Sequence, residues 1–117
     1  MKKVIIAGCR NFNNYSVAEI FIDECIKNEN VVIISGGCKG ADRLGEIYAQ
    51  KHGIEIIKFP AEWSRYGKAA GPIRNRKMAE DADIIICFWD KKSRGTKSLI
   101  DYAEKLNKKV YVKYIGF

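Results

Sequence analysis

Residues 31–48, "VVIISGGCKGADRLGEIY", join an apolar run to a glycine-rich turn and then to a stretch with helical spacing. The run over 31–35 is β-branched and uninterrupted, as in a strand buried on both faces. Leu44, Ile47 and Tyr48 then recur at helical spacing, and Gly53 is a typical residue at the end of a helix. This stretch predicts a strand, a tight turn and a helix that begins near residue 40 or 41.

The same alternation of strand and helix runs through the whole chain. Apolar runs at 3–7, 54–59, 82–89 and 109–114 predict four more strands. Helices are predicted from the capping box Ser16-x-x-Glu19, from Pro72 in a first turn, and from near Thr96. The apolar stripe of the first of these helices is predicted to be Val17, Ile20, Phe21 and Cys25. Residues 60–71 are expected to form a loop.

Buried strands that alternate with helices indicate a parallel sheet with helices on both faces. Because such crossovers are right-handed, we expect a Rossmann-like three-layer α/β sandwich. Its five-stranded parallel sheet is expected to have the order 3-2-1-4-5, within a single domain over residues 1–117. In such sheets, ligands bind beyond the carboxyl ends of the strands where the strand order reverses.

Composition narrows the class of protein. The chain has 117 residues with a formal net charge of +7, which favours anionic partners. No apolar run approaches the length of about 20 residues that a membrane helix needs, and the first residues lack a signal-peptide pattern. The four cysteines form no C-x-x-C pair, and there is one histidine, so no metal site is expected. We therefore expect a cytoplasmic protein with free thiols and no membrane partner.

Four turns follow predicted strands at the same edge of the sheet, and three of them lead directly into a helix. Glycine lets a backbone approach an anion closely, and the amide groups at a helix start attract negative charge. Arginine adds bidentate contacts to phosphate. The turns therefore predict binding of a phosphate-bearing ligand by residues Gly8, Cys9, Arg10, Asn11, Ser35, Gly36, Gly37, Lys39, Gly40, Asp42, Arg74, Asn75, Trp89, Asp90, Ser93, Arg94, Gly95 and Thr96.

Several of these residues have two interpretations. Asp42 is suited to a ribose hydroxyl and equally to compensation of the helix dipole, while Glu46 is expected to pair on the helix surface. For Trp63 we favour packing, and for Trp89 packing and stacking on a base are equally favoured. Asp90 is suited to a ribose contact or to capping a turn.

Two nucleotide-binding motifs are absent from the sequence. There is no G-x-x-x-x-G-K-[ST], which excludes a P-loop NTPase, and no G-x-G-x-x-G follows the first strand. The second absence excludes a standard dinucleotide fold.

Four segments resemble the YspA-type, cpYpsA-related branch of the SLOG superfamily. They are "VIIAGCRNF" (4–12), "SGGCKGADRLGE" (35–46), "FPAEWSRYGKAAGPIRNRKMAE" (59–80) and "CFWDKKSRGTKSLI" (87–100). That superfamily includes LOG-type nucleotide phosphoribohydrolases, Smf/DprA DNA-processing proteins and sensors of NAD-derived nucleotides. The resemblance implies a Rossmann-like fold and a nucleotide-type ligand.

The resemblance also tests for hydrolysis. The hydrolases use an arginine, to which Arg74 or Arg76 is similar, and a glutamate just after a glycine-threonine turn. Here Lys97, Ser98 and Leu99 follow Gly95-Thr96, and Asp101 is expected to face elsewhere. The absent carboxylate argues for binding without hydrolysis, although Glu46 or Asp42 remains as a substitute acid.

The leading expectation is therefore a sensor or sequestering protein for a phosphate-bearing nucleotide derivative, such as an ADP-ribose-like, NAD-derived or cyclic signalling molecule. The alternative is a LOG-like phosphoribohydrolase that breaks an N-glycosidic bond. Binding of single-stranded nucleic acid is a third interpretation, which we expect to be unlikely because the lysines are scattered. No cofactor other than the nucleotide-type ligand is expected. We expect the protein to form a homo-oligomer.

Overall fold

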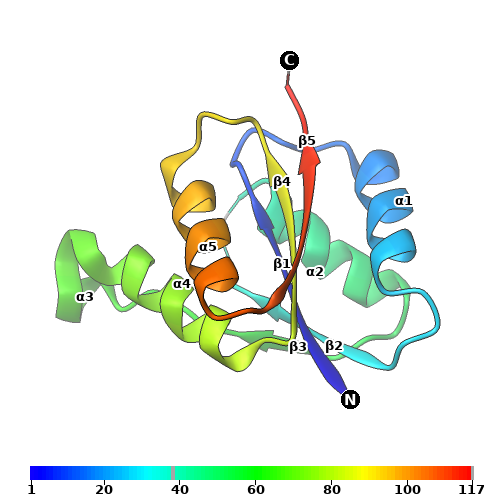
Figure 1. Cartoon of the computed structure of the whole chain (residues 1–117), viewed down its shortest axis with the longest axis horizontal. Helices are drawn as coiled ribbons and strands as arrows, with labels where there is room; N and C mark the ends of the chain where they lie inside the picture. The colour runs from blue at the N-terminus through cyan, green and yellow to red at the C-terminus, as the bar shows by residue number, and fades with distance from the viewer. Residues whose placement is uncertain (38, 117) are drawn as a thin grey trace.

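The computed structural model describes residues 1–37 and 39–116 of the chain, and it contains a five-stranded parallel sheet in the order β3-β2-β1-β4-β5. The strands are β1 (Lys2–Gly8), β2 (Val31–Ser35), β3 (Ile56–Lys58), β4 (Ile84–Trp89) and β5 (Lys109–Tyr114). The helices are α1 (Tyr15–Cys25), α2 (Ala41–Lys51), α3 (Trp63–Tyr66), the 3-10 helix η1 (Gly67–Ala69), α4 (Ala70–Asp81) and α5 (Arg94–Lys105) (Figure 1). The predicted strand order is confirmed.

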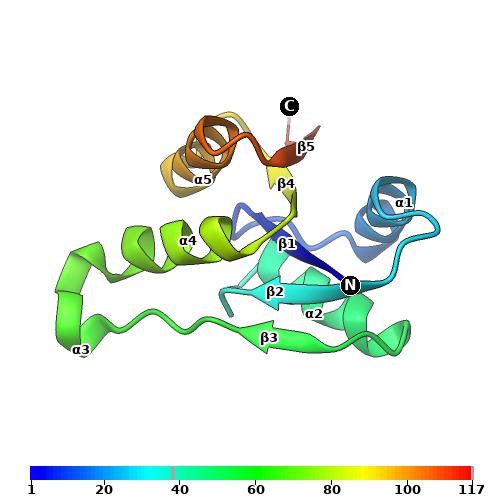
Figure 2. The ribbon, with the colours of Figure 1, turned by 60° about the horizontal axis from the view of Figure 1, so that its bottom comes forward.

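Helices cover both faces of the sheet, because each central strand is buried on both sides. Figures 1 and 2 show α1 and α2 on one face and α4 and α5 on the other. Alternate side chains of β1, β2 and β4 therefore enter two different cores. This arrangement is the three-layer α/β sandwich that the sequence predicts.

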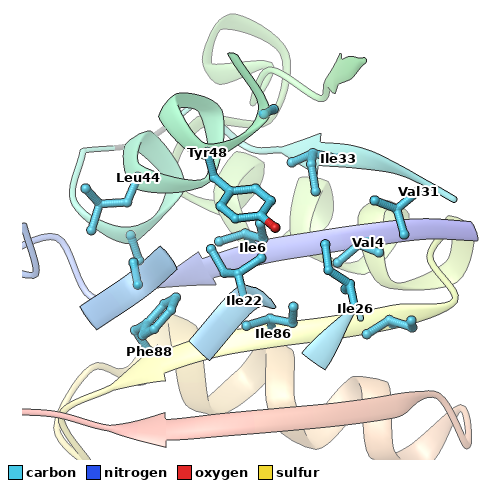
Figure 3. Close-up of a cluster of buried hydrophobic side chains, with 14 of the residues drawn as sticks. Val4, Ile6, Ile22, Ile26, Val31, Ile33, Leu44, Tyr48, Ile86 and Phe88 are labelled. Carbon is cyan, nitrogen blue, oxygen red and sulfur yellow. The ribbon is translucent and has the colours of Figure 1, made fainter. Parts of the chain in front are cut away.

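The first core lies between the sheet and the helices α1 and α2 (Figure 3). Ile6 and Phe88 are fully buried there, and Ile22 of α1 and Tyr48 of α2 pack over them. The Phe88 ring stacks on Phe12 at a centroid distance of 4.9 Å. These contacts hold the end of β4 against the segment that follows β1.

The second core lies between the sheet and the helices α4 and α5. Ile5, Ile85 and Cys87 from the strands contact Met78 of α4 and Leu99 of α5. This packing anchors both helices on the sheet. The polar residues of α4 and α5 therefore have fixed positions beside the carboxyl ends of the strands.

Register places the turns after β1 and β4 side by side. Val4 of β1 pairs with Ile33 of β2 on one side and with Ile84 of β4 on the other. The pairing of β1 with β4 continues to Gly8 and Phe88, so both strands end at the same level. This is the reversal of strand order at which the sequence predicts a ligand.

The start and the buried face of α1 differ from the prediction. Asn14 is the N-cap, and its side-chain oxygen accepts the Val17 N–H at 3.2 Å, so the predicted capping box at Ser16 does not start the helix. Val17, Phe21 and Cys25 of the predicted stripe pack partly buried against the first core, beside the fully buried Ala18 and Ile22. The predicted stripe is wrong at Ile20, which is 62% exposed.

The chain between β3 and α4 also differs from the prediction. Residues 60–71 contain α3, η1 and the start of α4 instead of a continuous loop. In both views α3 lies at the outer end of α4, away from the sheet (Figures 1 and 2). β3 pairs with β2 over three residues only, which shortens the strand predicted over 54–59. No helix within the described part of the chain is both long and apolar enough to cross a bilayer.

Candidate functional site

A cleft of about 950 Å³ opens at the carboxyl ends of β1 and β4, between α4 and α5. The turn after β1 and the first turn of α5 lie at its sheet end, and the facing sides of α4 and α5 form its walls. The lining residues are Ala7, Gly8, Cys9, Arg10, Asn11, Asp42, Trp63, Gly71, Pro72, Arg74, Asn75, Arg76, Met78, Ser93, Arg94, Gly95, Thr96, Ser98, Leu99, Asp101, Tyr102 and Lys105. Its size is in the range of small-molecule sites in proteins.

The cleft brings together three of the four predicted turns. Twelve predicted residues line it, namely Gly8, Cys9, Arg10, Asn11, Asp42, Arg74, Asn75, Arg76, Ser93, Arg94, Gly95 and Thr96. The other eight do not, namely Ser35, Gly36, Gly37, Lys39, Gly40, Glu46, Trp89 and Asp90. Cys38, in the middle of the fourth turn, lies outside the described residues.

The lining carries a surplus of positive charge. Its cationic side chains are Arg10, Arg74, Arg76, Arg94 and Lys105, and its carboxylates are Asp42 and Asp101. Five cations against two carboxylates give a net charge of +3 in a concave site, which focuses a positive potential on a bound anion. Burial raises the pKa of the Cys9 thiol, with Asp90 adding to the effect, so this lining group is neutral.

Asp90 fixes the turn that leads into α5. Its Oδ1 accepts the backbone N–H groups of Lys92 and Ser93, both at 2.8 Å. These bonds, led by the one from Ser93, hold the pKa of Asp90 below its usual range. Of the two predicted roles for Asp90, the structure therefore shows the turn cap.

The first turn of α5 presents backbone donors at the cleft. Lys97 N–H bonds to the Ser93 carbonyl at 3.2 Å, but no described residue accepts from the amides of Arg94, Gly95 or Thr96. Ser93, at the N-cap, makes no side-chain capping bond. Three helix-start amides with no protein acceptor are suited to an anionic group.

The turn after β2 is explained by contacts inside the protein. Arg74 Nη1 donates to the Gly36 carbonyl at 2.6 Å and to the Phe59 carbonyl at 3.3 Å. A Cβ on Gly36 would lie 2.7 Å from Arg74 Nη1, and one on Gly40 would lie 2.4 Å from the Cys9 carbonyl oxygen. Gly40, with a φ of +77° and backbone atoms beside it, therefore requires glycine without any ligand, whereas a side chain at Gly36 would displace the guanidinium of Arg74.

One amide of this turn already has a partner, since Gly37 N–H donates to Ser35 Oγ at 3.0 Å. Binding of phosphate by this turn stays a prediction. The buried Arg74 acts as a bridge that links the turn after β2 and the end of β3 to α4.

Glu46 is not at the helix surface, which corrects the prediction. Its side chain is buried, and Ser35 Oγ donates to Glu46 Oε2 at 2.7 Å. Arg43 approaches the other oxygen at 3.5 Å from the solvent side. The reason is the close packing of α2 on β2, which places Ser35 directly under the helix.

The two tryptophans have different surroundings, and Trp89 takes the packing role that was one of its two predicted roles. Trp89 donates its indole N–H to the Ser93 carbonyl at 3.0 Å, and its ring lies against Tyr114 at 6.1 Å. Trp63 lines the cleft and is 56% exposed, so the packing favoured for it is wrong. No local signal separates the two residues, because the difference arises from where α3 is placed.

Sequence reasoning missed part of α5. Ser98, Asp101, Tyr102 and Lys105 line the cleft, so Asp101 does not face elsewhere as predicted. Its carboxylate accepts from Lys97 Nζ at 2.9 Å. The helical spacing of polar residues could have predicted these positions. Residues four, seven and eleven positions after Arg94, which are Ser98, Asp101 and Lys105, share one face of a helix. Over the described residues, no group of three or more potential ligands is placed to hold a metal ion.

Comparison with known proteins identifies the family. Residues 2–66 match the family described as "YAcAr: YspA, cpYpsA-related SLOG family", which is more than half of the chain. The chain belongs to this SLOG family. The matched segment contains the turns after β1 and β2 and also Trp63, whereas α4 and α5 lie beyond it.

Three known proteins are similar to this SLOG chain. The "Gene 61 protein" of Mycobacterium phage D29 is 29% identical over 113 residues, which is 90% of each chain. DNA processing protein A (DprA) from Streptococcus pneumoniae has a TM-score of 0.74 at 20% identity, and DprA from Helicobacter pylori has 0.69 at 23%. Each covers 95% of this chain, which in turn spans 49% and 64% of the two DprA chains. The likeness to DprA shows a shared fold.

Proposed function

We propose that this SLOG protein binds a phosphate-bearing nucleotide derivative in the cleft between α4 and α5. An ADP-ribose-like, NAD-derived or cyclic signalling nucleotide fits the proposal, and the protein then acts as a sensor or sequestering protein. The observation that carries the proposal is the cationic cleft at the reversal of strand order, where the amides of Arg94, Gly95 and Thr96 meet no acceptor among the residues that the structure describes.

The chemistry at the start of α5 favours a phosphate. The helix dipole places partial positive charge at this end, and amide donors without a partner bind anionic oxygens well. The exposed side chains of Arg10, Arg76 and Arg94 line the same space. Because Asp90 already holds the preceding turn, a ligand meets donors that need little ordering.

The structure supports binding over hydrolysis. Glu46, one substitute acid, is buried against Ser35 and does not line the cleft. Asp101 lines it but is paired with Lys97. We therefore expect no free base when nucleoside monophosphates are incubated with the protein and analysed by chromatography. If base is released, an Asp42→Asn variant that loses the activity identifies Asp42 as the acid.

A thermal-stability panel tests the proposal. A ligand at 100 times its dissociation constant adds about 2.7 kcal/mol to the free energy of unfolding. We expect this from at least one of NAD, ADP-ribose, nucleoside monophosphates and cyclic dinucleotides. Arg94→Ala removes a charged hydrogen bond and should weaken binding by about 10- to 100-fold. Arg43→Ala, whose side chain is 64% exposed outside the cleft, is the matched control.

No stabilisation by any member of the panel would refute the nucleotide proposal. Equal losses in Arg94→Ala and Arg43→Ala would show that binding depends on general charge and not on the cleft.

Single-stranded nucleic acid is the second candidate. DprA from H. pylori binds single-stranded DNA, and the present chain shares its fold and carries a net charge of +7. If a strand binds through several phosphates, its affinity should fall steeply with salt concentration. A plot of the logarithm of the binding constant against the logarithm of the salt concentration should have a slope of about −0.7 for each phosphate neutralised. A titration of an oligonucleotide at three salt concentrations separates this candidate from a small nucleotide.

A further inference from the structure

Trp63 combines exposure with a place at the cleft. It is the first residue of α3, a four-residue helix in which no residue is buried, and 56% of its surface is accessible. It nevertheless lines the same cleft as the start of α5. A single exposed apolar residue on an open surface needs no functional explanation, whereas an exposed tryptophan in a concave cationic site points to contact with a ligand.

Of the other aromatic residues near the cleft, Trp89 and Tyr66 have ring partners, and Tyr102 is bonded through its hydroxyl. Trp89 bonds to the Ser93 carbonyl and lies against Tyr114, outside the cleft. Tyr66, three residues after Trp63, has the cations of Arg65 and Lys77 over its ring at 5.0 and 5.7 Å. Tyr102 lines the cleft, but its hydroxyl is tied to Glu80 at 2.7 Å.

The Trp63 ring lies beside the first turn of α4. A Cβ added to Gly71 would lie 3.6 Å from Trp63 Cη2, so the far edge of the indole lies against the first turn of α4. Asn75 and Arg76 of the same helix line the cleft as well. The ring therefore borders the space that α4 and α5 enclose, while the amide donors of α5 lie in the same cleft.

We propose that Trp63 is the wall on which the nucleobase of the ligand stacks. The inference rests on the proposed function, because it needs a nucleotide in the cleft. An indole presents a large face to which any base can stack, so this subsite reads the presence of a base more than its identity. The base belongs either to a free nucleotide or to a single strand, and the two sources are separated below.

The experiment compares ligands with and without a base. Binding of ADP-ribose, ribose 5-phosphate and single-stranded decathymidylate is measured by calorimetry on the wild-type protein, Trp63→Ala and Trp63→Phe. Ile20→Ala, which removes another exposed apolar side chain on the distant α1, is the control. Thermal unfolding of each variant is recorded first, and the exposure of Trp63 predicts an unchanged midpoint.

We expect Trp63→Ala to bind ADP-ribose about 10- to 100-fold more weakly, the range for loss of a stacked base. Trp63→Phe should retain part of the affinity, and ribose 5-phosphate should bind all variants alike. In the wild-type protein, ADP-ribose should quench the emission of the exposed Trp63, and the quenching should be lost in Trp63→Phe.

Each outcome decides a different point. Unchanged affinity of Trp63→Ala for both ADP-ribose and decathymidylate would overturn the stacking inference and leave the proposed function intact. Loss of affinity for decathymidylate alone would retain stacking and transfer it to a strand. Absence of binding by all three probes would overturn the stacking inference, whereas the nucleotide proposal is refuted only if no member of the thermal-stability panel stabilises the protein either.

Discussion

Gly36→Ala is the substitution that tests how the site is assembled. Its Cβ would lie 2.7 Å from Arg74 Nη1, 2.8 Å from Arg74 Cζ and 3.0 Å from Asp42 Oδ2. The backbone of Gly36 is not left-handed, so alanine adds no backbone strain of its own. The guanidinium must move, and its 2.6 Å bond to the Gly36 carbonyl is then lost or lengthened.

The magnitude follows from three contributions. Overpacking of a filled site costs about 1–3 kcal/mol, and a hydrogen bond to a charged group contributes about 1.5–3 kcal/mol. Replacing glycine returns about 0.4–1 kcal/mol through the unfolded chain. Since the displaced arginine retains part of its bonding, we expect a net loss of about 2 kcal/mol, or roughly 8 °C in the unfolding midpoint.

Urea unfolding of a double-mutant cycle measures the effect. In an Arg74→Ala background the space beside Gly36 is vacated, so Gly36→Ala should cost less than about 0.5 kcal/mol, which leaves most of the effect as coupling. Gly95→Ala is the matched control, because a Cβ there has nothing within 4 Å and should leave the free energy of unfolding nearly unchanged. A loss of equal size in both backgrounds would refute the role given to Arg74.

Three further predictions concern the fold around the cleft. Phe88→Ala should lower the free energy of unfolding by about 3–5 kcal/mol in urea, because the ring is fully buried between Phe12 and Phe21; a loss below about 1 kcal/mol would contradict this packing. Ser35→Ala leaves the buried Glu46 without its 2.7 Å donor and should cost about 1–3 kcal/mol at pH 7, with ligand affinity unchanged if Glu46 has no role in the cleft. Burial raises the pKa of Cys87 to about 12, so its proton is held more tightly in the folded state; stability should be complete below pH 9 and fall by up to about 1.4 kcal/mol per pH unit toward pH 12, a slope that Cys87→Ala should reduce.

The sheet with helices on both faces was predictable because each central strand is apolar on both sides and alternates with helices. The ends of β5 agree with the predicted 109–114. The helix α3 was not predictable, since four residues are too few for a periodic pattern. The exposure of Ile20 on α1 also depends on how the helix packs and not on spacing alone.

The sequence predicted the edge of the sheet at which the cleft lies. It did not predict which side chains and turns face the cleft. The turns after β1 and β4 line it because neighbouring strands end at the same level. The turn after β2 does not, because Arg74 crosses over Gly36 from α4, a contact between residues 38 positions apart. The places of Trp63 and Trp89 likewise depend on how α3 and β5 pack.

The two edge strands of the sheet, β3 and β5, are poorly suited to pairing with a second copy of the chain. Self-association stays a prediction. β3 offers three residues for pairing, too few for a stable added strand, and β5 carries exposed lysines at 109 and 113. A second copy aligned along β5 would bring these like charges together, and lysines on an outer strand discourage such pairing. Assembly of this chain with itself, and any tendency to aggregate, should therefore proceed through helix surfaces and not by extending the sheet.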